Sequence, residues 1–457
     1  MKVVLADVPM AHLKGEAVTE SPNLGILYII SYTKERLPNV EFHYLEPFLN
    51  LKKHLAEIKR LKPDVYGVSF TTPKKSLAFE AVNHVKQVLP NVLVVAGGPH
   101  PTIDPSEVFA NSKTDVCVIG EGEETFVELL KALLEKKELS GVDGIAYRDK
   151  LGNIHSNPLR KLINNINFPP AWDIIDFAKY DGPVRKKHPF AYVLPSRGCP
   201  AACTFCSSPV WRLKKPWIRL RSPQDIAKEV KYLYNTGVRE IYIRCDTFNV
   251  NTDWAISVCE EIEKLNMKDL YFQCNLRADK VNEKLAAKLK NINCWLVHIG
   301  IESFNDRVLK GINKMVTFED TIRTLNILKK YRINVYGFFM LYNAWEENGV
   351  LNYETTEEVL HTLRVVKKLL KDKLLTYISW SITNPIIGSK LHEIAKRHNI
   401  ISENKNLPLK LPIPEEEMQL CLKEGLMLQL WNGIVNNQIN RRSMKRVMRK
   451  INIILEL

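Results

Sequence analysis

The sequence lacks both an apolar run long enough to span a membrane and a secretory signal peptide. Its longest apolar run, LGILYIISY at 24–32, covers nine residues, whereas a membrane-spanning helix needs about 20. The N-terminus, MKVVLADVPM, has one lysine and then Asp7 where a signal peptide would continue its apolar core. These two absences predict a cytoplasmic protein.

The cysteines also lack the pattern of a disulfide framework. The 457-residue chain has nine of them, an odd and unevenly spread set that a reducing compartment would keep as free thiols. Six stand apart and are expected to be small buried side chains: Cys117, Cys245, Cys259, Cys274, Cys294 and Cys421. The other three, Cys199, Cys203 and Cys206, lie within eight residues and call for a more specific explanation.

The composition excludes a disordered or fibrous chain, because 45% of the residues are hydrophobic and 25% are charged, close to the globular average. Basic residues number 65 against 51 acidic ones, a net charge of +14. Such an excess fits a nucleic-acid partner, a membrane surface or a solvated basic surface, so it decides nothing until it is located. The length predicts two or three domains, because single cores stop growing at about 250–300 residues.

Residues 1–150 alternate short apolar runs with amphipathic helical segments, such as KVVLADV and LGILYIISYTKERL. This alternation predicts an α/β domain of the doubly wound, Rossmann-like type, with helices on both faces of a parallel sheet. Its ligand should lie beyond the carboxyl ends of the strands, where the loops TTPKK, GGPHPT and GEGEE fall. No GxGxxG follows the first strand, which disfavours a dinucleotide ligand.

Three further segments follow. Residues 151–188 lack periodicity and carry several prolines, which predicts a linker. Residues 189–395 contain about six strand-helix units, which predict a partial or full (βα) barrel with its chemistry at the strand C-termini. Residues 396–457 are predicted to form a small helical C-terminal domain. The basic end of this domain fits either a solvated or packing face or a contact with an anionic or lipid molecule.

The cysteine cluster stands in the segment SRGCPAACTFC, directly after the expected strand AYVLP. Three thiolates on one short loop can bind three corners of a 4Fe-4S cluster and leave one iron open for another ligand. The alternative is a structural zinc site. Zinc takes four ligands, usually from two separated pairs, and no second CxxC or HxxxH lies nearby.

The motif CxxxCxxC, with Phe205 before its last cysteine, resembles that of the radical S-adenosylmethionine (SAM) superfamily. In that superfamily SAM chelates the open iron, and the reduced cluster cleaves it to a 5'-deoxyadenosyl radical. The resemblance extends to the segments RCDTFN, QCNLRAD and GIES at later strand ends. It implies that SAM is bound by Phe205, Asp246, Asn275, Arg277, Asp279 and Glu302. Arg277 suits a carboxylate because its guanidinium can make a planar two-pronged contact.

The N-terminal loops resemble those of the cobalamin-binding domains in the cobalamin-dependent branch of this superfamily. The resemblance implies that cobalamin is bound by Asn23, Leu24, Gly25, Ser69, Phe70, Thr71, Gly97, Gly98, Pro99, His100, Gly120, Glu121, Gly122 and Glu123. Glycines suit such loops because the backbone must approach a bulky ligand closely. The stretch MAHLKG keeps the HxxG of the DxHxxG motif but has Met10 for the aspartate, so His12 lacks the partner of an axial ligand and is expected to be a surface histidine.

Together these resemblances imply a cobalamin-dependent radical SAM methyltransferase that methylates an unactivated carbon through the deoxyadenosyl radical and methylcobalamin. One alternative keeps both cofactors but cyclises or rearranges its substrate without methyl transfer. A remote alternative, resting on the charge, is a basic RNA-binding protein with a structural metal site. The expected partners are a small-molecule, peptide or lipid substrate and an electron donor such as flavodoxin or ferredoxin, with nucleic acid disfavoured and membrane contact left open.

Overall fold

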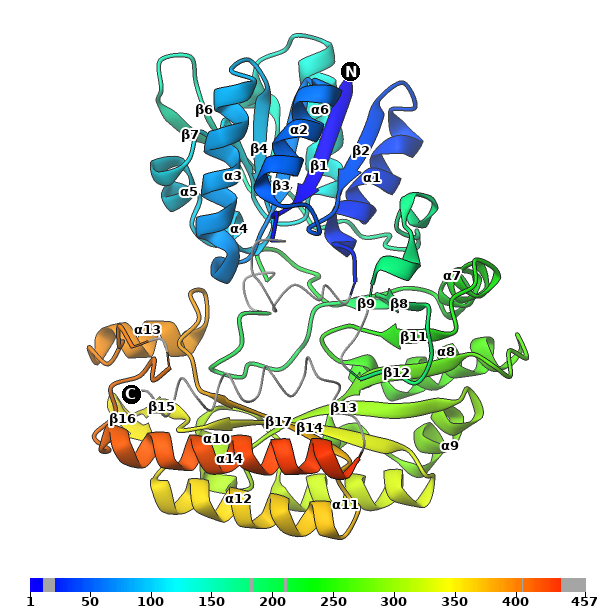
Figure 1. The fold of residues 1–457 in the computed structure, drawn as a ribbon, viewed down its shortest axis with the longest axis vertical. Helices are drawn as coiled ribbons and strands as arrows, with labels where there is room; N and C mark the ends of the chain where they lie inside the picture. The colour runs from blue at the N-terminus through cyan, green and yellow to red at the C-terminus, as the bar shows by residue number, and fades with distance from the viewer. Residues whose placement is uncertain (11–20, 181–183, 209–211, 405, 437–457) are drawn as a thin grey trace. The chain divides into compact units, whose positions relative to one another are not determined.

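The computed structural model describes all residues except 11–20, 181–183, 209–211, 405 and 437–457. The chain forms two compact units, labelled by element in Figure 1. The first unit comprises Met1–Gly182 with Val210–Trp217, and the second comprises Pro183–Pro209 with Ile218–Leu457. Most of the segment expected as a linker therefore packs within the first unit, and the division at 150, 188 and 395 stays a prediction. Within the described ranges, no helix has the length and apolarity needed to cross a bilayer.

The first unit is built on a seven-stranded sheet in the order β2-β1-β3-β4-β5-β6-β7. Its strands are β1 (Lys2–Asp7), β2 (Glu41–Leu45), β3 (Val65–Ser69), β4 (Leu93–Gly97), β5 (Val116–Val118), β6 (Ile145–Arg148) and β7 (Ile154–Ser156). The first five pair in parallel, whereas β6 and β7 are antiparallel and were not expected. The predicted doubly wound fold is confirmed, and the strand order reverses between β1 and β3, where such folds bind ligands.

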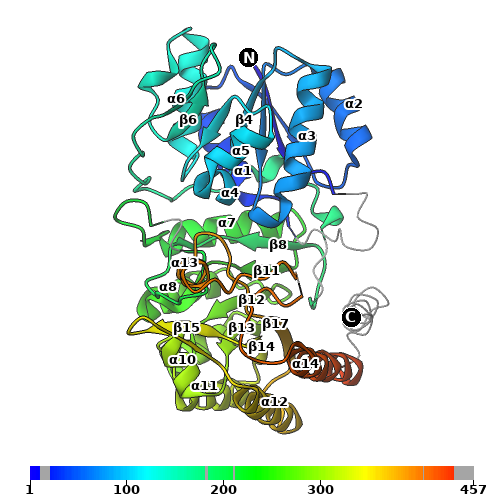
Figure 2. The ribbon, with the colours of Figure 1, turned by 90° about the vertical axis from the view of Figure 1, so that its left-hand side faces the viewer.

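Helices cover both faces of this sheet. They are α1 (Leu24–Arg36), α2 (Leu51–Leu61), α3 (Lys75–Val88), α4 (Pro99–Ile103), α5 (Pro105–Asn111) and α6 (Glu123–Leu134). One core cluster joins α2, α3 and α5 to the sheet, and a second joins α1 and α6 to its other face. Figure 2 shows these helices with the strands between them. Strands buried on both faces read as the unbroken apolar runs seen in the sequence.

The second unit is built on six parallel strands in the order β17-β14-β13-β12-β11-β8. They are β8 (Phe190–Val193), β11 (Glu240–Ile243), β12 (Tyr271–Leu276), β13 (Cys294–Glu302), β14 (Asn334–Leu341) and β17 (Tyr377–Ile382). Within the described residues the sheet does not close, because β8 and β17 are its two edges. The prediction of a partial barrel is confirmed over that of a full one.

The helices of this unit are α7 (Pro223–Asn235), α8 (Thr252–Glu263), α9 (Glu283–Asn291), α10 (Asp306–Gly311), α11 (Phe318–Lys330), α12 (Thr356–Lys371), α13 (Lys390–Arg397) and α14 (Glu415–Val435). Two small antiparallel pairs, β9 (Ser196–Arg197) with β10 (Arg219–Leu220) and β15 (Ala344–Glu347) with β16 (Val350–Tyr353), complete it. Local signals set several helix starts. Thr317 opens α11 and Thr355 opens α12 with reciprocal capping boxes.

Candidate functional site

The three-cysteine loop follows β8 and the short strand β9, as the sequence predicts. Two backbone hydrogen bonds of Thr204 hold it. Its N–H donates to the Ile312 carbonyl at 2.9 Å, and its carbonyl accepts from the Leu391 N–H at 2.8 Å. Phe205 packs against an apolar cluster that includes Ile312 and Trp345. The middle of the loop is therefore anchored, which positions the cysteines on either side.

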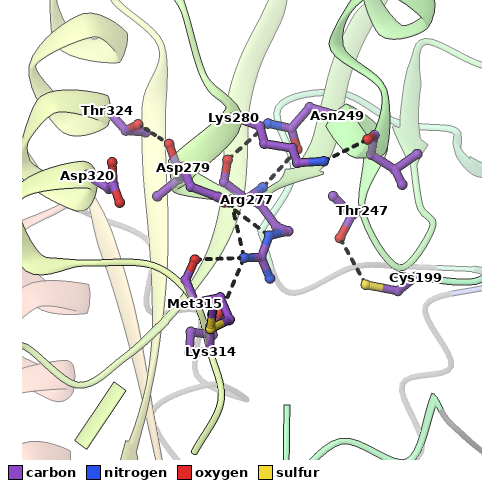
Figure 3. A network of polar contacts seen from close by, with 12 residues as sticks. Cys199, Thr247, Asn249, Arg277, Asp279, Lys280, Lys314, Met315, Asp320 and Thr324 are labelled. Carbon is purple, nitrogen blue, oxygen red and sulfur yellow. Dashed lines mark hydrogen bonds and ion pairs between the residues drawn. The ribbon is translucent and has the colours of Figure 1, made fainter. Parts of the chain in front are cut away.

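The three thiols lie in different surroundings. The Sγ of Cys199 is 3.8 Å from the Oγ1 of Thr247 (Figure 3). The Sγ of Cys206 accepts from the Ser208 N–H at 3.4 Å. Cys203 is buried, and this burial raises the pKa of its thiol, although the nearby Lys314 and Arg277 cations act in the opposite direction. All three cysteines are free thiols. Each would bind a metal cluster as a thiolate, after its thiol loses a proton.

The residue types of the loop suit an iron-sulfur cluster. Three cysteine thiolates can each bind a separate iron of a 4Fe-4S cluster, whereas a structural zinc site takes four donors around one ion. Among the described residues, no group of three His, Cys, Asp or Glu side chains converges on one point. The preference for a cluster over zinc therefore rests on the spacing of the cysteines in the sequence.

Two predicted SAM-binding side chains belong to neighbouring strands or to the segment just beyond them. Asp246 is exposed just beyond the end of β11, where its Oδ1 accepts from the Ser208 hydroxyl at 3.3 Å. Asn275 lies on β12, accepts from the Tyr242 hydroxyl, and donates to the Cys245 carbonyl at 3.0 Å. Asp246 is thereby linked through Ser208 to the cysteine loop, whereas the amide of Asn275 is occupied within the sheet.

Arg277 makes the two-pronged contact that its guanidinium allows, but within the chain (Figure 3). Its Nε is 3.0 Å from Asp279 Oδ1 and its Nη2 is 3.3 Å from Asp279 Oδ2. The Nη2 also donates to the Lys314 carbonyl at 3.0 Å. The Asn249 amide binds both backbone groups of Arg277, at 2.9 and 3.0 Å. Asn249 was not singled out from the sequence, although it stands three residues beyond Asp246 in the same strand-end segment.

Glu302 ends β13 in the left-handed region, with φ +67, and is nearly buried. Its Oε1 accepts from the Lys314 Nζ at 2.8 Å. A Cβ on Gly300 would collide with the Glu302 carboxylate and would lie 3.0 Å from the Lys314 Nζ, so the ion pair sits directly over this glycine. The Lys314 Nζ is also 5.9 Å from the centre of the Phe205 ring. Lys314 was missed because a loop lysine carries no pattern that reveals its partner.

In the first unit, the loops predicted to enclose cobalamin lie together at the carboxyl ends of β3, β4 and β5. The Phe70 N–H donates to the Gly97 carbonyl at 3.1 Å, and the His100 N–H donates to the Phe70 carbonyl at 3.2 Å. Gly98 has φ +92, and a Cβ there would lie 2.7 Å from the Ser69 Oγ. Glycine is therefore required where these two loops meet. Ser69 and Pro99 are half-buried, and Thr71 is exposed.

Two predicted side chains of these loops point into the protein. Phe70 and His100 are buried, with ring centroids 5.7 Å apart, and both contact Phe79. The imidazole Nδ1 lies 3.2 Å from the Thr72 hydroxyl, and the Nε2 lies 3.3 Å from a Glu107 carboxylate oxygen. Burial holds the pKa of His100 below its ordinary value. Phe70 and His100 therefore expose almost no surface to a ligand, and their backbone N–H groups are already bonded within the loops.

The third loop, 120–123, is held against its neighbours. The Gly120 N–H donates to the Thr102 hydroxyl at 3.0 Å. A Cβ on Gly122 would lie 2.8 Å from the Ile29 side chain of α1. Glu121 is half-buried and accepts from a backbone N–H at 3.3 Å, whereas Glu123 is buried at the start of α6. The glycines here permit close packing of the loop, and the two glutamates are largely enclosed.

Asn23 caps α1, with its Oδ1 accepting from the Ile26 N–H at 3.3 Å. Its amide also donates to Asp7 at 3.3 Å, and Tyr44 donates to the same carboxyl group at 3.0 Å. Burial raises the pKa of Asp7, which ends β1 beside the reversal in strand order. Asp7 and Tyr44 were not singled out from the sequence. Leu24 and Gly25 follow at the helix start, half-buried and exposed respectively, and His12 lies outside the described residues.

Two family models match this chain: the radical SAM superfamily over residues 193–364 and the B12 binding domain over residues 12–130. An uncharacterized methyltransferase of Pyrococcus horikoshii is 33% identical to it over 88% of this chain and 84% of its own length. The chain belongs to the cobalamin-dependent radical SAM enzymes. The cofactors of this radical SAM enzyme are accordingly a 4Fe-4S cluster, SAM and cobalamin, as the motifs implied.

Two other similarities are informative. The anaerobic magnesium-protoporphyrin IX monomethyl ester cyclase of Rubrivivax gelatinosus is 27% identical over 72% of this chain and 58% of its own length. The solved structure of OxsB, a cobalamin-dependent radical enzyme with aqua-cobalamin and SAM bound, superposes with a TM-score of 0.73 at 18% identity. It covers 99% of this chain and 70% of its own, which shows a shared fold. These findings favour an enzyme over the RNA-binding alternative.

Proposed function

We propose that this radical SAM enzyme is a methyltransferase that transfers a methyl group from cobalamin to an unactivated carbon atom. One observation carries the proposal. The chain has a B12 binding domain, and in its other unit the three cysteines and several residues predicted to bind SAM stand at or beyond the carboxyl ends of neighbouring parallel strands. The methyltransferase of Pyrococcus horikoshii, at 33% identity, supports methyl transfer as the outcome.

Cys199, Cys203 and Cys206 would each bind one iron of the cluster and leave the fourth iron for SAM. When bound, the cluster and SAM supply a 5'-deoxyadenosyl radical, and cobalamin supplies the methyl group. The protein orients these groups and excludes water from them. The anchoring of Thr204 and Phe205 against the barrel supports this role, because it fixes the loop that carries the three thiols.

Around SAM, two of the charged side chains would already be held by ion pairs within the protein before SAM binds. Asp246 is exposed and can accept from an ammonium group. Glu302 is nearly buried and paired with Lys314, so a cationic ligand could share its carboxylate. Arg277 is already paired with Asp279, so its guanidinium is not available for a two-pronged contact with the SAM carboxylate. This pair would instead position the loop and contact SAM through its remaining polar groups. Preorganised charges of this kind need no rearrangement when the ligand arrives.

Cobalamin would be held by the loops after β3, β4 and β5, chiefly through backbone groups and the residues that are partly exposed. Gly98 and Gly120 have positive φ and bring the backbone of these loops close together. Asn23, Leu24 and Gly25 would add the start of α1. The substrate class stays open between small molecules, peptides and lipids, and a flavodoxin or ferredoxin would serve as the electron donor.

A second candidate function is cyclisation or rearrangement without methyl transfer, favoured by the identity to the Rubrivivax gelatinosus cyclase. The two functions differ in their products. A methyltransferase forms S-adenosylhomocysteine and 5'-deoxyadenosine in each turnover, whereas the alternative forms deoxyadenosine without sustained formation of S-adenosylhomocysteine.

The test is anaerobic incubation of the reconstituted enzyme with methyl-deuterated SAM, a reductant, cobalamin and a cell extract that contains small molecules, peptides and lipids. Mass spectrometry should detect a product that carries the CD3 label, together with both nucleoside products. Deoxyadenosine alone would contradict methyl transfer and favour the alternative.

Two variants give the test a matched control. Cys203→Ala should lose the visible absorbance of the cluster and all deoxyadenosine formation, because one corner of the cluster has no ligand. Cys274→Ala should keep both, because Cys274 is buried in β12 at 3.9 Å from another buried thiol, Cys294. Equal behaviour of the two variants would contradict the assigned ligands.

A further inference from the structure

Aromatic rings form a stack across the inner face of the barrel sheet. Tyr242 of β11 lies 4.6 Å from His298 of β13 with an interplanar angle of 20°. His298 in turn stacks on Tyr336 and Phe338 of β14, with angles of 28° and 18°. Tyr336 and Phe338 are 4.6 Å apart and only 10° from parallel. The four rings therefore share nearly one orientation.

The stack faces away from the helices that cover the sheet. Residues of β14 alternate, so that Phe339 points to the opposite face from Phe338. Phe339 stacks on Trp380 of β17 at 4.7 Å, and a Cβ on Gly425 of α14 would lie 3.1 Å from the Trp380 ring. The face of Phe339 is thus the helix-covered one. Tyr336 and Phe338 therefore lie on the opposite, inner face of the sheet.

The last ring of the stack is open. Phe338 is 37% exposed although it stands in the middle of a central strand. The register explains this exposure, because Phe338 pairs with Gly300 on β13 and with Ser379 on β17. Neither of these small residues can cover a phenyl ring. A central strand thus leaves a large apolar surface uncovered between two small neighbours.

This surface adjoins the candidate SAM site. Gly300 is the residue over which the ion pair of Glu302 and Lys314 sits. Neighbouring strands lie about 4.8 Å apart, so a group resting on Phe338 would lie within a strand spacing or two of this pair. His298, within the stack, is uncharged like the phenyl ring of Phe338. Burial, helped by the Arg244 cation, lowers the pKa of His298 to about 3, and its Nε2 is 2.8 Å from the Gln273 amide oxygen. The stack therefore offers a neutral, planar platform.

We infer that Phe338 is a substrate-binding residue and that the substrate carries a planar conjugated ring system which extends the stack. This inference rests on the proposed function, since it places the substrate beside the SAM site. A planar aromatic group on Phe338 would gain a stacking attraction in addition to the burial of its apolar area. A saturated ring of equal size would gain only the burial. Tyr336 and Phe338, at alternate positions of β14, thus form the end of the stack. The outer face of the Phe338 ring remains for the ligand.

The test measures binding rather than turnover, so that it can fail independently of methyl transfer. Naphth-1-ol and decahydronaphth-1-ol have the same carbon skeleton and hydroxyl group, but only the first is planar. Each is titrated into the reconstituted holoenzyme and followed by saturation-transfer difference NMR. The wild-type protein should bind the planar probe at least about 2-fold more tightly than the saturated one.

Three variants locate the site. Phe338→Ala should weaken binding of naphth-1-ol by about 2- to 12-fold. Phe338→Leu keeps the apolar volume and should lose only the preference for the planar probe. Tyr232→Ala removes a 44% exposed ring of α7 and should bind as the wild type does. Equal affinities for the two probes in the wild type, or a Phe338→Ala variant that binds naphth-1-ol like the wild type, would overturn the inference. Methyl transfer would then still be open to its own test.

Discussion

Glu354 offers a sharp test of the packing behind the strand end that carries Glu302. It is fully buried, between the end of β16 and the start of α12. Its carboxyl group accepts from the Asn343 N–H at 3.1 Å, from the Asn343 amide at 2.8 Å and from the Ser303 hydroxyl at 2.8 Å. Burial raises its pKa from 4.5 to about 7, against these hydrogen bonds. We therefore choose Glu354→Gln, which keeps the shape and removes the ionisation.

The sign of the effect follows from the raised pKa. The folded state binds the proton of Glu354 more tightly than the unfolded state, so the free energy of unfolding falls as the pH rises. The contribution is fully present below about pH 4.5 and is lost as the pH passes through about 7. A shift of this size corresponds to about 3 kcal/mol. The stability of Glu354→Gln relative to the wild type should therefore rise by about 2.5 kcal/mol from pH 5 to pH 8.

The assay is urea unfolding of the full chain at several pH values, followed by circular dichroism and tryptophan fluorescence. Glu357→Gln changes an exposed carboxylate of the same helix and serves as the matched control. It should follow the pH dependence of the wild type. A stability difference between Glu354→Gln and the wild type that stays constant across this pH range would refute the reasoning, because the carboxyl group would then not ionise within it.

Two further substitutions test the candidate sites. Gly98→Ala should destabilise the first unit by about 1–2 kcal/mol and weaken cobalamin binding in absorbance titrations. Gly152 has a similar φ of +90, but a Cβ there would have nothing within 4 Å. Gly152→Ala should therefore show the backbone strain without the defect in cobalamin binding. Equal binding defects in the two variants would contradict a role for the contact with Ser69. Lys314→Met should lower the free energy of unfolding by about 3 kcal/mol in urea, because it leaves the nearly buried Glu302 without its cation. Adding Glu302→Gln should restore part of that stability. A loss well below about 1 kcal/mol would mean that the pair behaves as a surface contact.

Much of the fold is predictable from periodicity, because it depends on local alternation. The apolar runs at 2–7, 65–69 and 93–97 became parallel strands of the first sheet, and the strand-helix units after 189 became the partial barrel. The antiparallel strands β6 and β7 and the hairpin of β15 and β16 were not expected. These strands are short and partly exposed, so they lack the long apolar run that marks a central strand.

The candidate chemistry is readable from the amino-acid sequence where it depends on close spacing along the chain. Three cysteines within eight residues predict a cluster-binding loop, and glycines after strand ends predict tight turns. The tertiary structure alone decided which side chains meet. It pairs Glu302 with Lys314, turns Phe70 and His100 into the core, and sets Phe338 between Gly300 and Ser379. Such contacts depend on strand register and side-chain direction between residues far apart in the chain, which no local pattern encodes.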